Sequence, residues 1–220
     1  MKTYIWFYST DFTTKTIIYP QNPAFFHLIL ILFLIFVAEM KKIILITGGQ
    51  RSGKSRKAEE LALQLAGHPV YIATARIWDE EFRQRVMRHQ ERRKERWTNI
   101  EEEKFLSRHL DNIRQKVVVI DCVTLWCTNF FFDHASDGQP PSSTEEILLE
   151  MKDEFDRFTA TDATFIFVTN EIGSGGVSGN VVQRQFTDLQ GWFNQYVAEK
   201  ADEVILMVSG ISVKIKESGK

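Results

Sequence analysis

The segment IILITGGQRSGKS, residues 43–55, decides the fold of this 220-residue chain. Its first five residues form a continuous apolar run, which is typical of a strand buried on both faces of a sheet. After the glycines, apolar residues recur at helical spacing within residues 55–66, at Ala58, Leu61, Ala62 and Leu65. A strand, a glycine-rich loop and a helix in this order predict the start of an α/β domain.

Residues 48–55 match the pattern G-x-x-x-x-G-K-[ST] at every fixed position. Glycines permit a tight turn whose backbone N–H groups point at phosphate oxygens, and the helix N-terminus adds about half a positive charge. Lys54 would reach the β- and γ-phosphates, and the Ser55 hydroxyl would bind Mg²⁺. A chance glycine-rich turn is the competing interpretation, which the flanking strand and helix disfavour. We predict a nucleoside triphosphate loop made of Gly48, Gly49, Gln50, Arg51, Ser52, Gly53, Lys54 and Ser55.

The rest of the chain repeats the alternation of short apolar runs with longer amphipathic stretches. Strands are predicted at residues 43–47, 70–73, 117–121, 165–169 and 204–208, with a last edge strand at 212–216. Helices are predicted at residues 55–66, 79–95, 147–158 and 183–200, and a surface loop at 133–143. Strands separated by helices predict a mostly parallel sheet covered on both faces.

Asp121 ends the apolar run VVVID, which is predicted to be a strand near the phosphate loop. A carboxylate at the carboxyl end of a neighbouring parallel strand faces the same edge of the sheet as the loop. An aspartate in this position is otherwise a common turn residue. Beside a phosphate loop we predict that Asp121 is the second protein ligand of Mg²⁺, together with Ser55.

Charge and cysteine content exclude several classes of protein. The chain has 27 Lys+Arg and 29 Asp+Glu, so its net charge of −2 gives no general attraction to nucleic acid. The two cysteines, Cys122 and Cys127, form no CxxC motif and have no histidine cluster beside them. Reduced, buried thiols in a cytoplasmic protein are therefore expected, rather than a disulfide framework or a zinc site.

The first 40 residues differ from the rest because they hold only four charged side chains. Their apolar run at residues 24–38 is 15 residues long, short of the roughly 20 that a membrane-spanning helix needs. We expect residues 1–39 to be an extension produced by a start assigned too early, before Met40. A membrane anchor, an uncleaved signal and a genuine extension are the alternatives, and membrane contact is doubtful. Residues 40–220 are then a single domain.

His89 lies among arginines in the stretch RQRVMRHQERRKER, residues 83–96. One interpretation is a solvated helix face on which His89 packs with Phe82 and Val86. The other is nucleophilic: a neutral imidazole attacks a nucleotide phosphorus while guanidinium groups hold phosphate oxygens. Spacing alone leaves both interpretations open.

Several segments occur in the order seen in one family of enzymes. They are GGQRSGKSRKAEE at 48–60, YIATA at 71–75, RVMRHQERR at 85–93 followed by Trp97 and Glu101, DCVTLWCTN at 121–129, VTNEIGSG at 168–175 and VSGISVKIK at 208–216. Together they resemble the bifunctional adenosylcobinamide kinase/adenosylcobinamide-phosphate guanylyltransferases of cobalamin biosynthesis. The resemblance covers residues 41–216, nearly the whole chain after Met40.

The resemblance implies a transferase with two activities. The family phosphorylates adenosylcobinamide with ATP or GTP, then transfers GMP from GTP to the phosphate through a guanylyl-histidine. That histidine corresponds to His89. Members of this family are trimers of P-loop NTPase domains with a RecA-like sheet. The resemblance therefore implies the same fold and a homo-oligomer for this chain. Beyond the phosphate loop, its nucleotide-binding positions correspond to Ala73, Thr74, Ala75, Gln90, Glu91, Arg92, Arg93, Glu101 and Asp121.

Three departures from the family pattern leave these assignments in place. Arg88 stands where some members have a second histidine, residues 177–179 (VSG) replace an expected proline-containing turn, and Asp121 replaces a glutamate seen in some relatives. A P-loop kinase of another small metabolite, a regulatory nucleoside triphosphatase and a membrane-tethered nucleotide-binding protein are the alternative functions.

Overall fold

The computed structural model describes residues 41–77, 80, 84, 94–135 and 141–217. All of them belong to one compact unit, Met40–Lys220. The predicted extension at residues 1–39 lies outside the described residues, so the domain boundary at Met40 stays a prediction.

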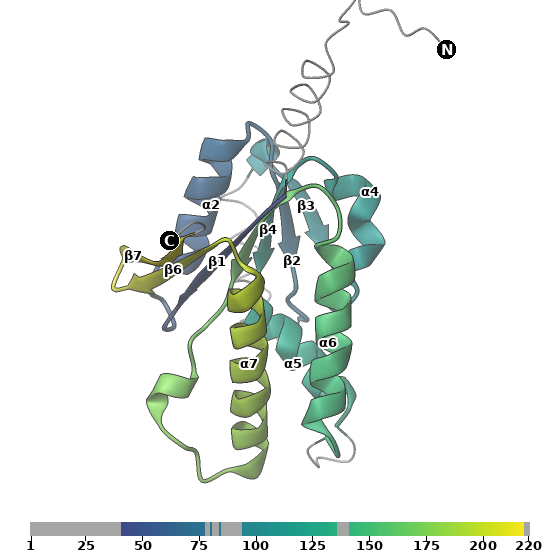
Figure 1. Cartoon of the computed structure of the whole chain (residues 1–220), viewed down its shortest axis with the longest axis vertical. Coiled ribbons are helices and arrows are strands. Elements are labelled where there is room, and N and C mark those ends of the chain that lie inside the picture. The colour runs from purple at the N-terminus through teal and green to yellow at the C-terminus, as the bar shows by residue number, and fades with distance from the viewer. Residues whose placement is uncertain (1–40, 78–79, 81–83, 85–93, 136–140, 218–220) are drawn as a thin grey trace, which may run out of the picture. The chain divides into compact units, whose positions relative to one another are not determined.

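Seven strands form a single sheet in the described part of the chain, in the order β3-β2-β4-β5-β1-β6-β7 (Figure 1). The first six strands in that order run parallel, and β7 pairs antiparallel with β6 at one edge. The predicted α/β fold with a RecA-like, mostly parallel sheet is confirmed. The strands are β1 (Lys42–Gly48), β2 (Val70–Ala73), β3 (Thr98–Glu101), β4 (Val117–Asp121), β5 (Thr164–Val168), β6 (Glu203–Val208) and β7 (Ile211–Glu217).

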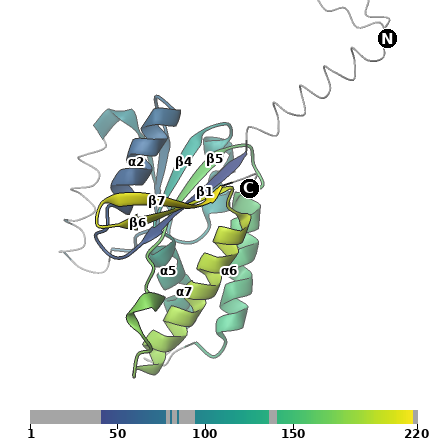
Figure 2. The ribbon, with the colours of Figure 1, turned by 60° about the vertical axis from the view of Figure 1, so that its left-hand side comes forward.

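Helices cover both faces of the sheet, as predicted. Figures 1 and 2 show α2 on one face and α5, α6 and α7 on the other. The α-helices are α2 (Lys54–Leu65), α4 (Leu110–Ile113), α5 (Val123–Asp133), α6 (Thr144–Phe158) and α7 (Val181–Lys200). Short 3-10 turns occur at η1 (Lys94–Arg96), η2 (Leu106–His109) and η3 (Gly173–Gly175).

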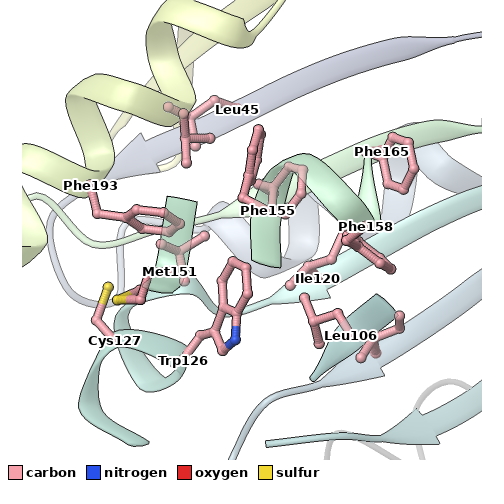
Figure 3. Packing of buried hydrophobic residues seen from close by; sticks show 14 of the residues in the cluster. Leu45, Leu106, Ile120, Trp126, Cys127, Met151, Phe155, Phe158, Phe165 and Phe193 are labelled. Atoms are coloured by element: carbon pink, nitrogen blue, oxygen red, sulfur yellow. The ribbon is translucent and has the colours of Figure 1, made fainter. Parts of the chain in front are cut away.

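The continuous apolar runs arise because successive strand residues enter two different cores. Ile44 and Ile46 of β1 pack with the cluster that contains Ala58 and Ala62 of α2. Leu45 belongs to the larger cluster on the other face, which α5, α6 and α7 cover. Aromatic rings fill this larger core (Figure 3), where the Trp126 and Phe193 ring centroids lie 5.4 Å apart in an edge-to-face arrangement.

Helices α6 and α7 both begin earlier in the chain than predicted, because each starts at a capping side chain. The Ser143 hydroxyl accepts a hydrogen bond from the backbone N–H of Glu146, so α6 begins three residues before the predicted start at Ile147. The Asn180 side chain likewise accepts from the N–H of Gln183 and starts α7. In both helices the capping residue precedes the first apolar position.

Three elements were missing from the sequence prediction, the short helix α4 among them, and one was predicted only in part. β3 and α5 were not expected, and Asp133, predicted to open a loop, is the last residue of α5. The rest of that loop includes residues 136–140, which lie outside the described residues. Of the helix predicted at 79–95, residues 80 and 84 are helical and Lys94–Arg96 form η1. The other residues of that stretch are not described.

The cysteine prediction is confirmed in its structural part. Cys122 and Cys127 are both free and buried. Burial, together with the neighbouring carboxylate of Asp121, raises the pKa of the Cys122 thiol to about 12. Burial also raises the pKa of Cys127 well above its ordinary value. Both thiols are therefore protonated at neutral pH and are poor nucleophiles.

Candidate functional site

The phosphate loop connects the carboxyl end of β1 to α2, as its sequence predicts. Gly48 adopts φ +148°, and a Cβ atom there would lie 2.3 Å from the carbonyl oxygen of Met207 in β6. Gly53 adopts φ +97° as the residue before α2. Only glycine fits the first position without displacing β6, so the loop is shaped by the neighbouring strand as well as by its own sequence.

Lys54 is the first residue of α2 and is only 7% exposed. Its ammonium group donates a hydrogen bond of 2.6 Å to the Gly49 carbonyl within the loop. Burial lowers the pKa of Lys54, and the carboxylate of Asp121 opposes that shift. The ammonium group thus lies inside the loop, within electrostatic range of the predicted metal ligand.

The β6–β7 turn supports the other side of the loop. The backbone N–H of Gly210 donates a hydrogen bond of 3.0 Å to the Ser52 carbonyl. Ser209 and Gly210 form this turn with φ values of +50° and +85°. The Ser52 hydroxyl is buried and has no hydrogen-bond partner among the described residues. Gln50 and Arg51 are exposed, and Ser55 is half-buried.

Asp121 lies at the carboxyl end of β4, and its position is fixed from the neighbouring strand. The Tyr71 hydroxyl on β2 donates a hydrogen bond of 2.6 Å to Oδ2 of Asp121. β5 lies between β4 and β1, where Val168 pairs with both Asp121 and Ile46. Asp121 is therefore separated from the strand of the phosphate loop by a single strand, at the same edge of the sheet.

Three of the predicted site residues are in register across three strands. Ala73, the last residue of β2, pairs with Glu101 on β3 and with Asp121 on β4. Parallel strands end at a common edge, so these three residues form a row at the carboxyl edge. The short strand β3, absent from the sequence prediction, is the element that carries Glu101 there.

Thr74 follows Ala73 and links this row to the segment after β4. Its side chain is fully buried; the hydroxyl donates to the Cys122 carbonyl at 2.8 Å and accepts from the Cys122 N–H at 2.9 Å. The Asn129 amide on α5 donates to the carbonyls of Thr74 and Glu103 at 2.8 and 2.9 Å. Thr74 is thus bonded within the protein through both its hydroxyl and its carbonyl, and it sets the position of Ala75.

The remaining predicted residues, His89, Gln90, Glu91, Arg92 and Arg93, lie outside the described residues. The structure consequently leaves the guanylyl-histidine prediction untested.

Two site features were not predicted from sequence. Tyr71 gave no signal of its own because it reads as an ordinary residue of an apolar strand. Asn170 lies in the segment VTNEIGSG, which carried the family resemblance but received no role. Its contacts with Thr124 and Gln190 join residues 46 and 20 positions away in the chain.

Comparison with known proteins assigns the chain to a family. A model of the cobinamide kinase/cobinamide phosphate guanyltransferase family matches residues 44–215. The chain belongs to this family. The predicted family, and the predicted class of enzyme, a transferase with kinase and guanylyltransferase activities, are confirmed.

Curated relatives agree with the family match. The bifunctional adenosylcobalamin biosynthesis protein CobU of Escherichia coli K12 is 39% identical over 180 residues, which cover 79% of this chain and 99% of the relative. CobU of Salmonella typhimurium LT2 is 38% identical over 184 residues, with the same coverages. CobP of Pseudomonas aeruginosa is 36% identical over 174 residues, or 78% of this chain and 96% of the relative. This family member thus spans its relatives almost entirely.

No helix in the described part of the chain has the length and apolarity needed to cross a membrane.

Proposed function

We propose that this protein phosphorylates adenosylcobinamide with ATP or GTP and then transfers GMP from GTP to the phosphate. The products of the second step are adenosyl-GDP-cobinamide and pyrophosphate. One observation carries the proposal: the phosphate loop with Lys54 and the carboxylate-bearing Asp121 lie at the same carboxyl edge of a sheet in a chain that belongs to this family. The enzyme domain is residues 40–220, and cytoplasmic location is the expected setting for both steps.

The kinase step is carried by positioning and charge stabilisation. Phosphoryl transfer needs little covalent help from the protein, so loop N–H groups and an ammonium group at the phosphates supply most of the catalysis. We propose that the nucleotide phosphates replace the Gly49 carbonyl as the partner of the Lys54 ammonium group. Burial by itself lowers the pKa of Lys54. Bound phosphates would raise this pKa again, because a polyanion stabilises the charged ammonium form.

Mg²⁺ fits the donors at this edge. The Ser55 hydroxyl and the Asp121 carboxylate are hard oxygen ligands, and Mg²⁺ is commonly bound by one or two carboxylates together with substrate phosphates. The hydrogen bond from Tyr71 leaves Asp121 oriented by the protein before any ion binds. When bound, the ion neutralises charge on the transferred phosphoryl group.

The guanylyl step is assigned to His89. A neutral imidazole is a competent nucleophile near pH 7, and the arginines around it in the sequence can hold phosphate oxygens. We propose that Gln90, Glu91, Arg92, Arg93, Ala73, Thr74, Ala75 and Glu101 contribute to binding of the GTP that guanylylates His89. The register of Ala73 with Glu101 supports this grouping.

A homo-oligomer, a trimer by family resemblance, is part of the proposal. The corrinoid is large compared with the nucleotide site, which favours a binding site formed between subunits.

The test is a coupled assay with adenosylcobinamide, GTP and Mg²⁺, in which the corrinoid products are separated and identified by mass spectrometry. Formation of adenosylcobinamide phosphate followed by adenosyl-GDP-cobinamide is expected. A Lys54→Ala variant serves as the control, because it retains His89 but loses the phosphate-loop ammonium group. Nucleotide hydrolysis that does not depend on the corrinoid, with no change in the corrinoid itself, would favour a regulatory nucleoside triphosphatase.

A further inference from the structure

The segment after β5 enters the space between the phosphate loop and Asp121, yet the proposed function gives it no role. Val168, at the end of β5, pairs with Ile46 before the phosphate loop and with Asp121 on β4. Asn170 follows two residues later. The next residue is tied directly to the loop, because the Glu171 N–H donates to the Gly48 carbonyl at 3.0 Å. Asn170 therefore lies between the two groups expected to flank the transferred phosphate.

The backbone of Asn170 is held firmly. Its carbonyl accepts from the Gln190 and Asn194 side-chain amides at 2.9 and 3.2 Å, and its N–H donates to the Thr124 hydroxyl at 2.9 Å. Gln190 is fully buried on α7, and Asn194 is fixed in turn by a 2.7 Å hydrogen bond from Thr169. Three hydrogen bonds to its own backbone thus hold Asn170 in place.

The side chain of Asn170 is bound much less securely. Its Nδ2 donates to the Thr124 hydroxyl at 3.2 Å, but that oxygen also accepts from the Asn170 N–H at 2.9 Å and from Gln190 Nε2 at 2.8 Å. A hydroxyl oxygen has two lone pairs, so three donors exceed its capacity. The Asn170 amide is the longest of the three contacts and the one most readily exchanged for another acceptor.

We propose that the Asn170 side-chain amide leaves Thr124 when nucleotide binds and donates to an oxygen of the transferred γ-phosphoryl group. This inference rests on the proposed kinase step. In that step the acceptor hydroxyl oxygen forms a bond to the γ-phosphorus and the bond to the β,γ-bridging oxygen breaks. The nucleoside diphosphate departs, and the hydroxyl proton is released. Asn170 exchanges no proton and acts as a neutral donor toward oxygens that carry the negative charge.

The geometry favours a donor here for two reasons. Asn170 is half-buried, so its amide can reach a ligand while its backbone stays within the buried network. Its release also costs the network little, because Thr124 keeps its two shorter hydrogen bonds. The side chain of a purely structural asparagine would make a hydrogen bond that its partner needs. The Thr124 oxygen is already saturated by two shorter hydrogen bonds, so it does not need the Asn170 side chain.

Two substitutions separate a phosphate donor from a structural residue. Asn170→Ala removes the donor. Asn170→Asp keeps the shape and can accept a hydrogen bond from the Thr124 hydroxyl, but it places a carboxylate beside the phosphates. Asn180→Ala is the matched control, since it removes another asparagine side chain and its hydrogen bond to the N–H of Gln183, away from this network.

The experiment measures adenosylcobinamide phosphorylation in single turnovers, guanylyl-protein formation from GTP without corrinoid, and the melting temperature. We expect Asn170→Ala to slow phosphorylation on the order of 100-fold. We expect Asn170→Asp to be slower still, because like charges repel. Guanylyl-protein formation should fall far less, since there the bond breaks at the α-phosphate. Melting temperatures should stay close to that of Asn180→Ala.

Phosphorylation by Asn170→Ala within threefold of wild type would overturn the inference, and so would equal losses in both activities. A phosphorylation rate of Asn170→Asp equal to or higher than that of Asn170→Ala would also contradict the inference. A wild-type protein that phosphorylates no adenosylcobinamide overturns the proposed function and this inference together. The two failures are therefore distinguishable.

Discussion

Tyr71 and Asp121, 50 positions apart in the chain, are joined by a 2.6 Å hydrogen bond across adjacent parallel strands. Tyr71 is 3% exposed and packs edge-to-face with Trp97 at a centroid separation of 5.8 Å. The contact with Trp97 fixes the orientation of the Tyr71 ring, and this orientation places the Tyr71 hydroxyl next to the Asp121 carboxylate. A packed core residue thus orients the predicted metal ligand.

Tyr71→Phe tests this relationship because it removes one oxygen and retains the ring contact with Trp97. We expect the kinase reaction to need several-fold more Mg²⁺ for half-maximal rate, since the freed carboxylate must be ordered when the ion binds. Stability should fall by only about 1 kcal/mol, the usual worth of one hydrogen bond. Initial rates over a Mg²⁺ titration give the result. An unchanged Mg²⁺ dependence would show that Tyr71 has no part in metal binding.

Gly48 and Gly49 form a matched pair for testing how β6 shapes the phosphate loop. A Cβ at Gly48 would lie 2.3 Å from the Met207 carbonyl, whereas one at Gly49 meets nothing within 4 Å. Gly48→Ala should destabilise the domain by about 1–3 kcal/mol, which lowers the melting temperature by roughly 2–4 °C per kcal/mol. Gly49→Ala should melt near the wild-type temperature. Equal melting temperatures for the two variants would mean that β6 does not constrain the loop.

The sequence predicted those parts of the fold whose signal is local. A continuous apolar run followed by a fixed glycine pattern specified β1 and α2 to within a residue. β3 was missed because it is a four-residue edge strand, TNIE, in which only Ile100 is apolar. α5 was missed for the opposite reason: VTLWCTNFFFD is largely apolar, so the contrast between its faces is small and its helical period is weak.

The site divides in the same way. Gly48–Ser55 could be named from a motif, and Asp121 from its place at the end of a strand. Tyr71, Thr124 and Gln190 could not, because their roles depend on which strands are neighbours and in what register. Sequence order gives neither, since β5 lies between β4 and β1 only in the folded sheet.

Glu154 offers a test of stability that is independent of catalysis. Its carboxylate is 1% exposed and accepts from the Ser107 N–H at 2.7 Å, the Ser107 hydroxyl at 3.1 Å and Arg157 at 2.9 Å. Glu154→Ala leaves the Ser107 donors without a partner, so we expect a loss of about 2–4 kcal/mol in chemical denaturation. Glu154→Gln keeps an acceptor and should lose less. The control is Arg157→Ala, an exposed partner worth about 0–1 kcal/mol; a loss as large as that of Glu154→Ala would contradict this account.

The ion pairs of Asp133 make the folding stability of the domain depend on pH in the acid range. Its hydrogen bonds with Arg76 lower its pKa below the ordinary value of 3.8, and Lys104 acts in the same direction. A lowered folded-state pKa contributes stability that is present above pH 3.8 and is lost as the pH falls through the folded value. Asp133→Asn should therefore melt below wild type at pH 7 and converge with it in strong acid. The pair is partly exposed, so a shift of a few degrees at most is expected. A constant difference across the acid range would exclude this charge as the cause.

His89 determines whether the second step is covalent. His89→Ala should abolish guanylylation while retaining part of the kinase activity, because the phosphate loop and Asp121 are unchanged. Incubation of wild type with α-labelled GTP should give a protein adduct that is labile to acid and stable to alkali, as expected for a phosphoramidate on histidine. His68→Ala is the matched control: this histidine lies 3.2 Å from the Thr98 hydroxyl, just before β2, and should not affect labelling. Active wild-type enzyme without an adduct, or labelling that persists in His89→Ala, would refute His89 as the nucleophile.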